Sequence, residues 1–285
     1  MSWELFVQVL FNGLSMGMIY VLIASGFTLI YSIMRILNFA HGELYMIAGY
    51  ITFYLFEEAG LNYFVTLLLA MAAVALLGAI IERVFFHPFL DQHDPPLIIA
   101  LGLMMLIPGV ALVGFGELDR GVKKIFPGVL QVGGAFISFE RIGIIIIAII
   151  IMIALNFFLK NFKLGRALQA ISQDAEAAAL QGVNVGAMST FGFALSCALA
   201  AAAGVLIAPL FVLNPFIGVE ATFKALIVVV IGGLGSVQGA LAGGLLLGFM
   251  ESFGYTLIGG VSEILIFCLV LFILLVRPRG LMGRY

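Results

Sequence analysis

Long apolar runs follow one another along almost the whole chain, separated by short stretches of Pro, Gly and charged residues. Each run is about 16 to 28 residues long, which is enough for an α-helix to cross a hydrocarbon core about 30 Å thick. The runs lack the ten-residue alternation of an outer-membrane barrel. The pattern therefore predicts an all-α, polytopic integral membrane protein.

Bounds set by Pro, Gly and charge give about eight to nine transmembrane helices, with nine as the best estimate. The run 222–232 is too short to cross alone, and "GGLGSVQG" after it allows a turn inside the membrane or a broken, re-entrant segment. We expect one transmembrane domain over 1–285. The predicted spans are 5–32, 41–56, 61–83, 97–115, 142–160, 187–207, 222–232, 236–253 and 261–276.

Composition supports the membrane class. Hydrophobic residues make up 64% of the chain and charged residues 10%, and the mean hydropathy is +1.24, which excludes an ordinary soluble domain. The net charge of −2 gives no reason to expect a nucleic-acid partner. The N-terminal stretch "MSWELFVQVLFNGLSMG" has no basic region typical of a signal peptide, so we expect the first helix to be retained.

Basic residues orient the helices, because cytoplasmic flanks carry an excess of Lys and Arg. If the tail "RPRGLMGRY" is cytoplasmic, alternation places eight basic residues inside and five outside. This split favours a cytoplasmic C-terminus and an extracytoplasmic N-terminus. The inner set is Arg35, Arg83, Lys160, Lys163, Arg166, Arg277, Arg279 and Arg284, and the outer set is Arg120, Lys123, Lys124, Arg141 and Lys224.

Two longer connections follow from this topology. The outer loop, 116–141, has Gly-Gly and Pro-Gly punctuation around β-favouring stretches, which predicts a small hairpin. The inner loop, 161–186, is rich in helix formers and has Gly182 as a helix stop. We expect a short amphipathic helix there, lying either on lipid headgroups or in a partner protein.

A few polar and small residues interrupt the apolar spans. Asn12, Ser15 and Ile19 share one face of the first span, with Tyr20 at its edge, so this face should contact other helices. Glu251 is a second acid expected to avoid lipid. Glycines four apart, which allow close helix packing, are Gly13 and Gly17, Gly239 and Gly243, and Gly244 and Gly248; Cys197 and Cys268 lie in apolar runs and are expected to be free thiols.

The stretch "NFAHGELYMIAGY" places an amide, an imidazole and a carboxylate together where the second span begins. Asn38 is a good helix N-cap, and Glu43 would gain from the positive end of the helix dipole, so capping alone explains both. The topology puts this stretch at the cytoplasmic end of a span. The alternative is a helix break that lines a polar pathway, where His41 and free backbone amides meet a solute.

Nothing in the sequence indicates catalysis, and we expect no catalytic residues and no metal site. "GGLGSVQG" lacks the lysine of a phosphate-binding loop, so the chain has no ATP-binding motif. His87 and His93 lie in "FFHPFLDQHDPP", where we expect solvated loop residues, with a His/Asp metal site as the weaker alternative.

The run "NGLSMGMIYVLIASGFTLIYSIMRILNFAHGELYMIAGY" closely resembles the start of LivH-type permeases, the membrane subunits of branched-chain amino-acid ABC importers. The resemblance continues through "GRALQAISQDAEAAALQGVN", "AAAGVLIAPLFVLNPFIG", "FKALIVVVIGGLGSVQGALAGGLLLGFMES" and "VRPRGLMG". These segments cover nearly the whole chain. They specify the permease family better than its substrate.

The resemblance assigns a role to the inner loop. Glu176-Ala177-Ala178, three residues and then Gly182 match the EAA-x-x-x-G core by which such permeases dock a coupling helix into an ATPase. With Asp174 they form the expected coupling site, although the usual apolar "LP" ending is absent. A compact helix with small residues fits a groove, and a glycine ends it sharply.

The resemblance also implies partners. These are a second related permease, two ATP-binding cassette ATPases and an extracytoplasmic substrate-binding protein, in the cytoplasmic (inner) membrane of a prokaryote. This chain would bind no cofactor, and ATP and Mg would be bound by the ATPases. The residues expected to line the substrate path or support its gate are Asn12, Ser15, Asn38, His41 and Glu43.

The predicted function is the transmembrane permease of an importer for leucine, isoleucine or valine. A permease for urea, short amides or another small organic solute is the alternative within the family. An ion-coupled secondary carrier is favoured by Glu43 and Glu251 as proton sites but disfavoured by the EAA core. A scaffold without transport is the third possibility.

Overall fold

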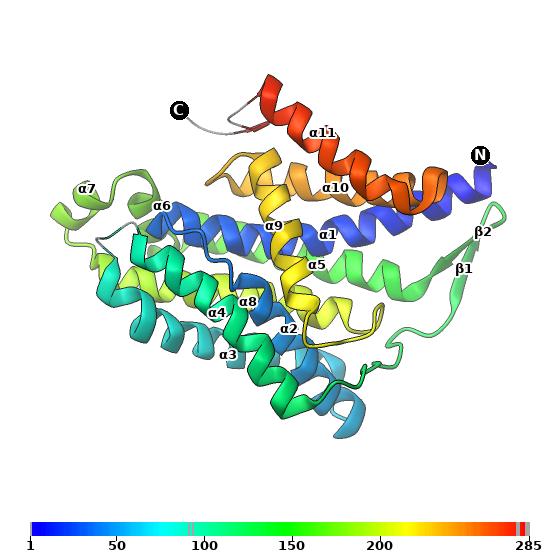
Figure 1. The fold of residues 1–285 in the computed structure, drawn as a ribbon, viewed down its shortest axis with the longest axis horizontal. Helices are drawn as coiled ribbons and strands as arrows, with labels where there is room; N and C mark the ends of the chain where they lie inside the picture. The colour runs from blue at the N-terminus through cyan, green and yellow to red at the C-terminus, as the bar shows by residue number, and fades with distance from the viewer. Residues whose placement is uncertain (1, 91, 93, 278–279, 283–285) are drawn as a thin grey trace.

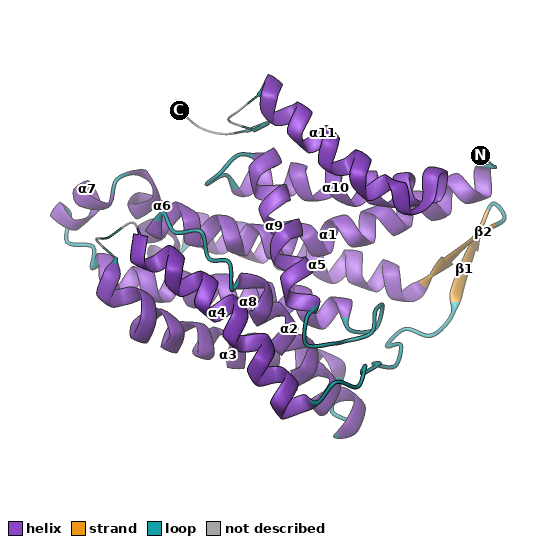
Figure 2. Ribbon diagram, viewed as in Figure 1, coloured by secondary structure: helices purple, strands orange, loops and turns teal. Residues whose placement is uncertain are grey.

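A computed structural model describes residues 2–90, 92, 94–277 and 280–282. Most of the described chain is helical, and its one sheet is a two-stranded hairpin, as Figure 2 shows. The prediction of an all-α membrane protein is confirmed. His93, Arg279 and Arg284, which entered the sequence predictions, lie outside the described residues.

Within the described residues, nine helices match the nine predicted spans one to one. Three of them are extended by irregular turns: α2 by a π-helix, α3 by a π-helix and a 3₁₀ turn, and α10 by a 3₁₀ turn. The nine are α1 (Trp3–Met34), α2 (His41–Thr52), α3 (Tyr63–Ile81), α4 (Asp94–Phe115), α5 (Phe139–Asn161), α8 (Val185–Ile207), α9 (Ile217–Gly232), α10 (Val237–Ile258) and α11 (Ser262–Val276).

Six helical stretches of the described chain are long and apolar enough to cross a membrane. The last, 237–276, contains both α10 and α11, which reverse direction at Gly259 with its φ of 64°. Helices α2 and α9 have 12 and 16 residues, about 18 and 24 Å of rise, so neither spans about 30 Å alone. The predicted start of α9 at 222 is wrong, because Gly218 and Glu220 already lie in its first turn.

Helix α1 lies at the centre of the bundle and contacts α5, α8, α9 and α10 (Figure 1). Its closest neighbour is α10, and the two meet backbone to backbone at glycines. A Cβ on Gly17 would lie 3.1 Å from the Gly244 carbonyl oxygen, and one on Gly13 would lie 3.1 Å from the Gly248 oxygen. The predicted glycine packing is therefore confirmed for these pairs.

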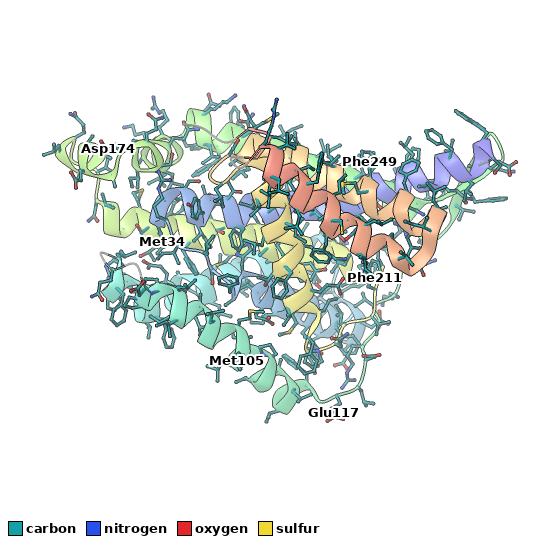
Figure 3. The ribbon with its side chains drawn as sticks, turned by 45° about the horizontal axis from the view of Figure 1, so that its top comes forward. Met34, Met105, Glu117, Asp174, Phe211 and Phe249 are labelled. Atoms are coloured by element: carbon teal, nitrogen blue, oxygen red, sulfur yellow. The ribbon has the colours of Figure 1, made fainter. Side chains whose placement is uncertain are left out.

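The two ends of the bundle carry different elements. The chain start and the hairpin of β1 (Val129–Val132) and β2 (Ala135–Ser138) lie at one end, and two short helices lie at the other (Figure 1). These short helices are α6 (Lys163–Gln173) and α7 (Ala175–Leu180). In Figure 3, Asp174 marks the second end, and Glu117 lies far from it.

The outer loop contains the predicted hairpin, with Leu130 paired to Ile137 in antiparallel register. The loop is shorter than predicted, because α5 begins at Phe139 rather than near 142. The Glu140 carboxylate in the first turn accepts hydrogen bonds from the amides of Ile125 and Phe126, at 2.9 and 3.0 Å, and so holds the loop to the helix.

The inner loop forms two helices, so the prediction of a single amphipathic helix is wrong. Asp174 adopts an extended conformation (φ −155°, ψ 109°) that ends α6, and its Oδ1 accepts a hydrogen bond from the Ala177 amide that begins α7. An Asp in this position caps the following helix more favourably than it continues the preceding one.

His87 is exposed, as expected of a solvated residue, but it lies on the 3₁₀ turn that extends α3 rather than in an irregular loop. Its Nδ1 is 3.1 Å from the Oε1 of buried Glu82. The other Glu82 oxygen accepts a hydrogen bond from Thr190 of α8. Among the described residues, no three His, Cys, Asp or Glu side chains gather as metal ligands. Both cysteines are free, with Cys197 buried and Cys268 exposed.

Candidate functional site

Helix α2 begins inside the bundle rather than at the end where α1 finishes. Helix α1 ends at Arg35, which has a positive φ of 56°, and residues 35–40 return non-helically along the bundle. His41 then contacts α1 at Ile23 and Gly26. Gly26 is eight residues from Met34, about 12 Å along the helix, so the expectation that α2 begins at the membrane mouth is wrong.

The His41 side chain anchors this half-helix to α1. Its Nε2 lies 3.1 Å from the Ile23 carbonyl oxygen, which can only accept, so this nitrogen donates. The ring meets Phe27 edge-on, with centroids 5.8 Å apart, and lies against Gly26, where no side chain intervenes. His41 is fully buried, and the ring contacts described above are all with helix α1.

Asn38 does not cap α2, contrary to the prediction. Its Oδ1 accepts a hydrogen bond from the Ala40 amide and forms a turn two residues before the helix. The helix amide of Gly42 donates instead to the hydroxyl of Thr222 on α9, at 3.0 Å. A hydroxyl from another helix therefore satisfies one of the amides that the N-terminus of α2 leaves open.

Glu43 carries a fully buried carboxylate for which no described residue is a hydrogen-bond partner. It lies against Gly218, where a Cβ would overlap its Oε2. This position is beside the first turn of α9 and in the first turn of α2, where the partial positive charges of both helix ends favour a carboxylate.

Asn12 and Ser15 lie elsewhere on α1. The Ser15 hydroxyl donates to the Asn12 carbonyl and accepts from Arg141 Nη1 of α5, both at 2.9 Å. The predicted contact of this face with other helices is thus confirmed. Arg141 lies in the first turn of α5 rather than in a loop. The structure separates these residues from the group of Asn38, His41 and Glu43, and the transport role of all five stays a prediction.

A cavity of about 550 Å³ opens between α1, α2, α9 and the connection 208–216. That connection pairs with the outer loop through two backbone hydrogen bonds between Leu213 and Arg120, at 2.8 and 2.9 Å. Phe211 marks the cavity in Figure 3, far from Asp174. The lining residues are Met16, Ile19, Tyr20, Ile23, Tyr45, Ile207, Phe211, Val212, Asn214, Phe216, Ile217, Glu220, Ala221 and Lys224.

Charged groups form one wall of this cavity. Lys224 Nζ lies 2.7 Å from Glu220 Oε1, 3.2 Å from Glu251 Oε1 and 3.1 Å from the Tyr20 hydroxyl. The Tyr20 hydroxyl donates to the second Glu251 oxygen at 2.5 Å. Lys224, which we expect on the outer flank of the seventh span, lies within α9 and contacts α1 and α10. The expectation that Glu251 avoids lipid is confirmed.

The expected coupling residues lie on the α6–α7 unit. Glu176 and Ala177 are exposed, Ala178 is buried against the bundle, and Leu180 is 86% exposed. Gly182 has a φ of 83°, and the amides of Gly182 and Val183 donate to the carbonyls of Ala179 and Ala178. This is the bonding of a Schellman motif, so the predicted helix stop at Gly182 is confirmed.

The comparison with known proteins decides the family. The family described as branched-chain amino acid transport system / permease component matches residues 9–275, which is nearly the whole chain. The chain belongs to this permease family. The recognition made from sequence motifs is confirmed, and the protein is a multi-pass membrane permease rather than an enzyme.

Several known permeases are similar in sequence to this chain over most or nearly all of its length. It is 36% identical to the high-affinity branched-chain amino acid transport system permease protein BraD of Pseudomonas aeruginosa. It is 34% identical to LivH of Escherichia coli strain K12, and each match covers 98% of this chain and 96% of the relative. The ribose import permease protein RbsC of Haemophilus influenzae is 26% identical over 65% of the permease and 59% of its own length. No solved structure matches the permease significantly.

Sequence reasoning missed the two features that the helix partners create. Thr222 reads as an ordinary residue of an apolar run, because its bond to Gly42 joins positions 180 residues apart. The sequence also did not show that Glu220, Lys224 and Tyr20 meet at one wall of the cavity. The spacing of Glu220 and Lys224, four residues apart in a helix, was the available signal.

Proposed function

We propose that this permease carries branched-chain amino acids (leucine, isoleucine or valine) across the cytoplasmic membrane of a prokaryote as one subunit of an ATP-driven importer. The nearly full-length family match is the observation that carries the proposal. BraD and LivH, which match 98% of this chain, are named as branched-chain amino acid permeases. The substrate is delivered by an extracytoplasmic binding protein.

The energy for transport comes from partner subunits in this proposal. Two ATPases bind ATP and Mg and dock on the α6–α7 unit, which lies at the end of the bundle opposite the hairpin. Asp174, Glu176, Ala177, Ala178 and Gly182 form the docking region. A second, related permease completes the pathway. The end that carries α6 and α7 faces the cytoplasm, and the C-terminus is cytoplasmic.

The exposed side chains of the α6–α7 unit support this docking role. Leu180 is an apolar side chain that is 86% exposed at the end of α7, where it covers nothing within this chain. A large apolar side chain exposed in this way can insert into a pocket on a partner protein and contribute much of the binding energy. The small exposed residue Ala177 allows the helix to approach a groove closely.

The direct test is uptake by the reconstituted complex. The tagged permease is extracted gently from its native membrane, co-purifying proteins are identified by mass spectrometry, and the complex is placed in liposomes with ATP inside. We expect two ATPases, a second permease and ATP-dependent uptake of labelled leucine when the binding protein is supplied. Uptake of urea or short amides without leucine uptake would contradict the proposed substrate.

One observation favours a second function. The buried Glu43 carboxylate has no hydrogen-bond partner among the described residues, as a proton-binding site of an ion-coupled carrier would. Such a carrier would transport without ATPases and would stop when the proton gradient is collapsed. Uptake that survives ATP depletion but not a protonophore would reverse the assignment.

A further inference from the structure

The cavity between α1, α2 and α9 combines two chemistries that an amino acid also combines. One wall carries a cation and an anion, Lys224 and Glu220, whose nearest charged atoms are 2.7 Å apart. The remaining lining is mostly aliphatic and aromatic, with Ile19 and Ile23 from α1 and Ile217 from α9. Pockets of this size, with apolar walls and a few polar groups, are typical of small-molecule sites.

The charges around Lys224 do not cancel. Glu251 lies behind the cavity wall, 23% exposed, and binds Lys224 at 3.2 Å while it accepts the Tyr20 hydrogen bond. Glu220 is a second partner for the same ammonium, and it is 65% exposed on the cavity side. If Glu220 turns toward a ligand, Lys224 still has the carboxylate of Glu251 as a partner. Glu220 is then available to bind an ammonium group.

We propose that Glu220 and Lys224 form a transient binding site for the zwitterionic head group of the transported amino acid. Glu220 binds its ammonium, Lys224 binds its carboxylate, and the branched side chain lies against Ile19, Ile23 and Ile217. Glu251 and Tyr20 are positioning residues that hold Lys224 in place. The proposal rests on the proposed function and adds the residues that recognise the substrate.

The exposure of Glu220 sets the strength of this site. Ion pairs between exposed groups contribute little, so the head group is held weakly and can move on. Passage along a transport path requires such weak contacts. A neutral solute such as urea does not need a paired cation and anion, so the site favours an amino acid over the amides.

The first experiment measures leucine uptake by the complete complex in liposomes, with saturating loaded binding protein. We compare wild type with Glu220→Gln, Lys224→Met and Lys224→Arg. The control Lys123→Met removes a lysine of the outer loop that lies over Phe56, 4.9 Å from its ring centroid. We expect Glu220→Gln and Lys224→Met to lower the uptake rate roughly tenfold or more, since each removes a charged hydrogen-bond partner.

Lys224→Arg keeps the positive charge and should retain part of the uptake, and Lys123→Met should retain nearly all of it. Uptake by Glu220→Gln and Lys224→Met at the wild-type rate would overturn the proposal while leaving the proposed function intact. Failure of the wild-type complex to transport leucine would instead refute the proposed function. The two failures are therefore distinguishable.

A second measurement does not depend on the variants folding. A leucine analogue with a photoreactive diazirine in its side chain is irradiated with the wild-type complex, and modified peptides are identified by mass spectrometry. We expect labels on the segments that line the cavity, within 16–23 and 207–224 or at Tyr45. Leucine should compete, whereas 4-methylpentanamide and 4-methylpentanoic acid should compete at least tenfold more weakly. Labels elsewhere, or equal competition by the uncharged amide, would overturn the proposal.

Discussion

The contact between Gly42 and Thr222 joins the start of α2 to α9. The Thr222 hydroxyl accepts the Gly42 amide at 3.0 Å, and its oxygen lies 3.1 Å from the carbonyl oxygens of Phe39 and Gly218. In a membrane interior no water replaces such a bond, so an amide without its partner is costly. The start of α2 is thus held in part by one hydroxyl from α9.

Thr222→Val keeps the shape of the side chain and removes this hydroxyl. We expect the variant to lose about 1–3 kcal/mol of stability, because the Gly42 amide is left buried without an acceptor. Thr222→Ser retains the hydroxyl and is the matched control. Thermal unfolding of both purified variants in the same detergent compares them, and equal midpoints for Val and Ser would refute the capping role.

Gly42 tests the same contact through its volume. An added Cβ would overlap the carbonyl oxygen of Gly218 and the Thr222 hydroxyl, so α9 would have to move. We expect Gly42→Ala to cost about 1–3 kcal/mol, as overpacked sites do. Gly102→Ala in α4 is the control, because nothing lies within 4 Å of its added Cβ. It should be neutral or stabilising by up to about 1 kcal/mol, the helix-propensity difference.

At this scale the sequence predicted which polar residues avoid lipid but not what they contact. His41 and Glu43 stood out because an imidazole and a carboxylate are rare in an apolar span. Their partners, Ile23, Gly218 and the first turn of α9, come from distant parts of the chain. Local patterns carry no information about such partners, so capping by Asn38 seemed sufficient.

Among the elements, the α6–α7 unit is the one that departs from the hydrophobic bundle. Asp174 divides it, and Gly182 ends it through a left-handed residue. The unit lies beyond the end of the spans, where its exposed residues are free to contact another protein (Figure 1). The length and caps of α7 therefore determine which side chains are presented to a partner protein.

Reversing the charge of Glu176 tests the docking role of α7. Glu176 is exposed, so we expect Glu176→Lys to change stability by no more than about 0.5 kcal/mol. Co-purifying ATPase and ATP-dependent uptake should fall by roughly tenfold, equivalent to about 1.4 kcal/mol of binding. Glu263→Lys is the control, because it makes the same charge change on an exposed residue in the first turn of α11. Normal uptake by Glu176→Lys would remove α7 from the coupling mechanism.

The elements themselves were largely predictable, because apolar length and glycine or charge at the ends are local signals. The division at Asp174 was not, since one residue can either continue or cap a helix. The early start of α9 was missed for a related reason. Glu220 looks like a loop residue until Lys224 and the cavity supply its surroundings.

The whole molecule is organised around α1, whose main helix contacts are with α5, α8, α9 and α10. Because α1 and α10 meet at glycines, their backbones lie unusually close and little side-chain volume separates them. We expect these two helices to move together during transport. Any change in access to the cavity then involves α2 or α9 moving against this pair.

Removal of Mg distinguishes the permease from its partners. In liposomes that hold the complete complex, chelation of internal Mg²⁺ with EDTA should stop leucine uptake, because the ATPases require the metal. The permease purified without its partners should hydrolyse no ATP above the rate of a blank, and restored Mg²⁺ should restore uptake. Hydrolysis by the isolated chain would contradict the assignment of ATP binding to partner subunits.

The contact of α2 with α9 also has a consequence for biosynthesis. Gly42 leaves the ribosome 180 residues before Thr222, the residue that accepts its amide. Until α9 is made, the start of α2 carries an open amide and the Glu43 carboxylate, which lipid does not tolerate. We therefore expect the nascent α2 to remain in the insertion machinery, or at the lipid headgroups, until α9 has been synthesised. Its final insertion would be a late event in synthesis.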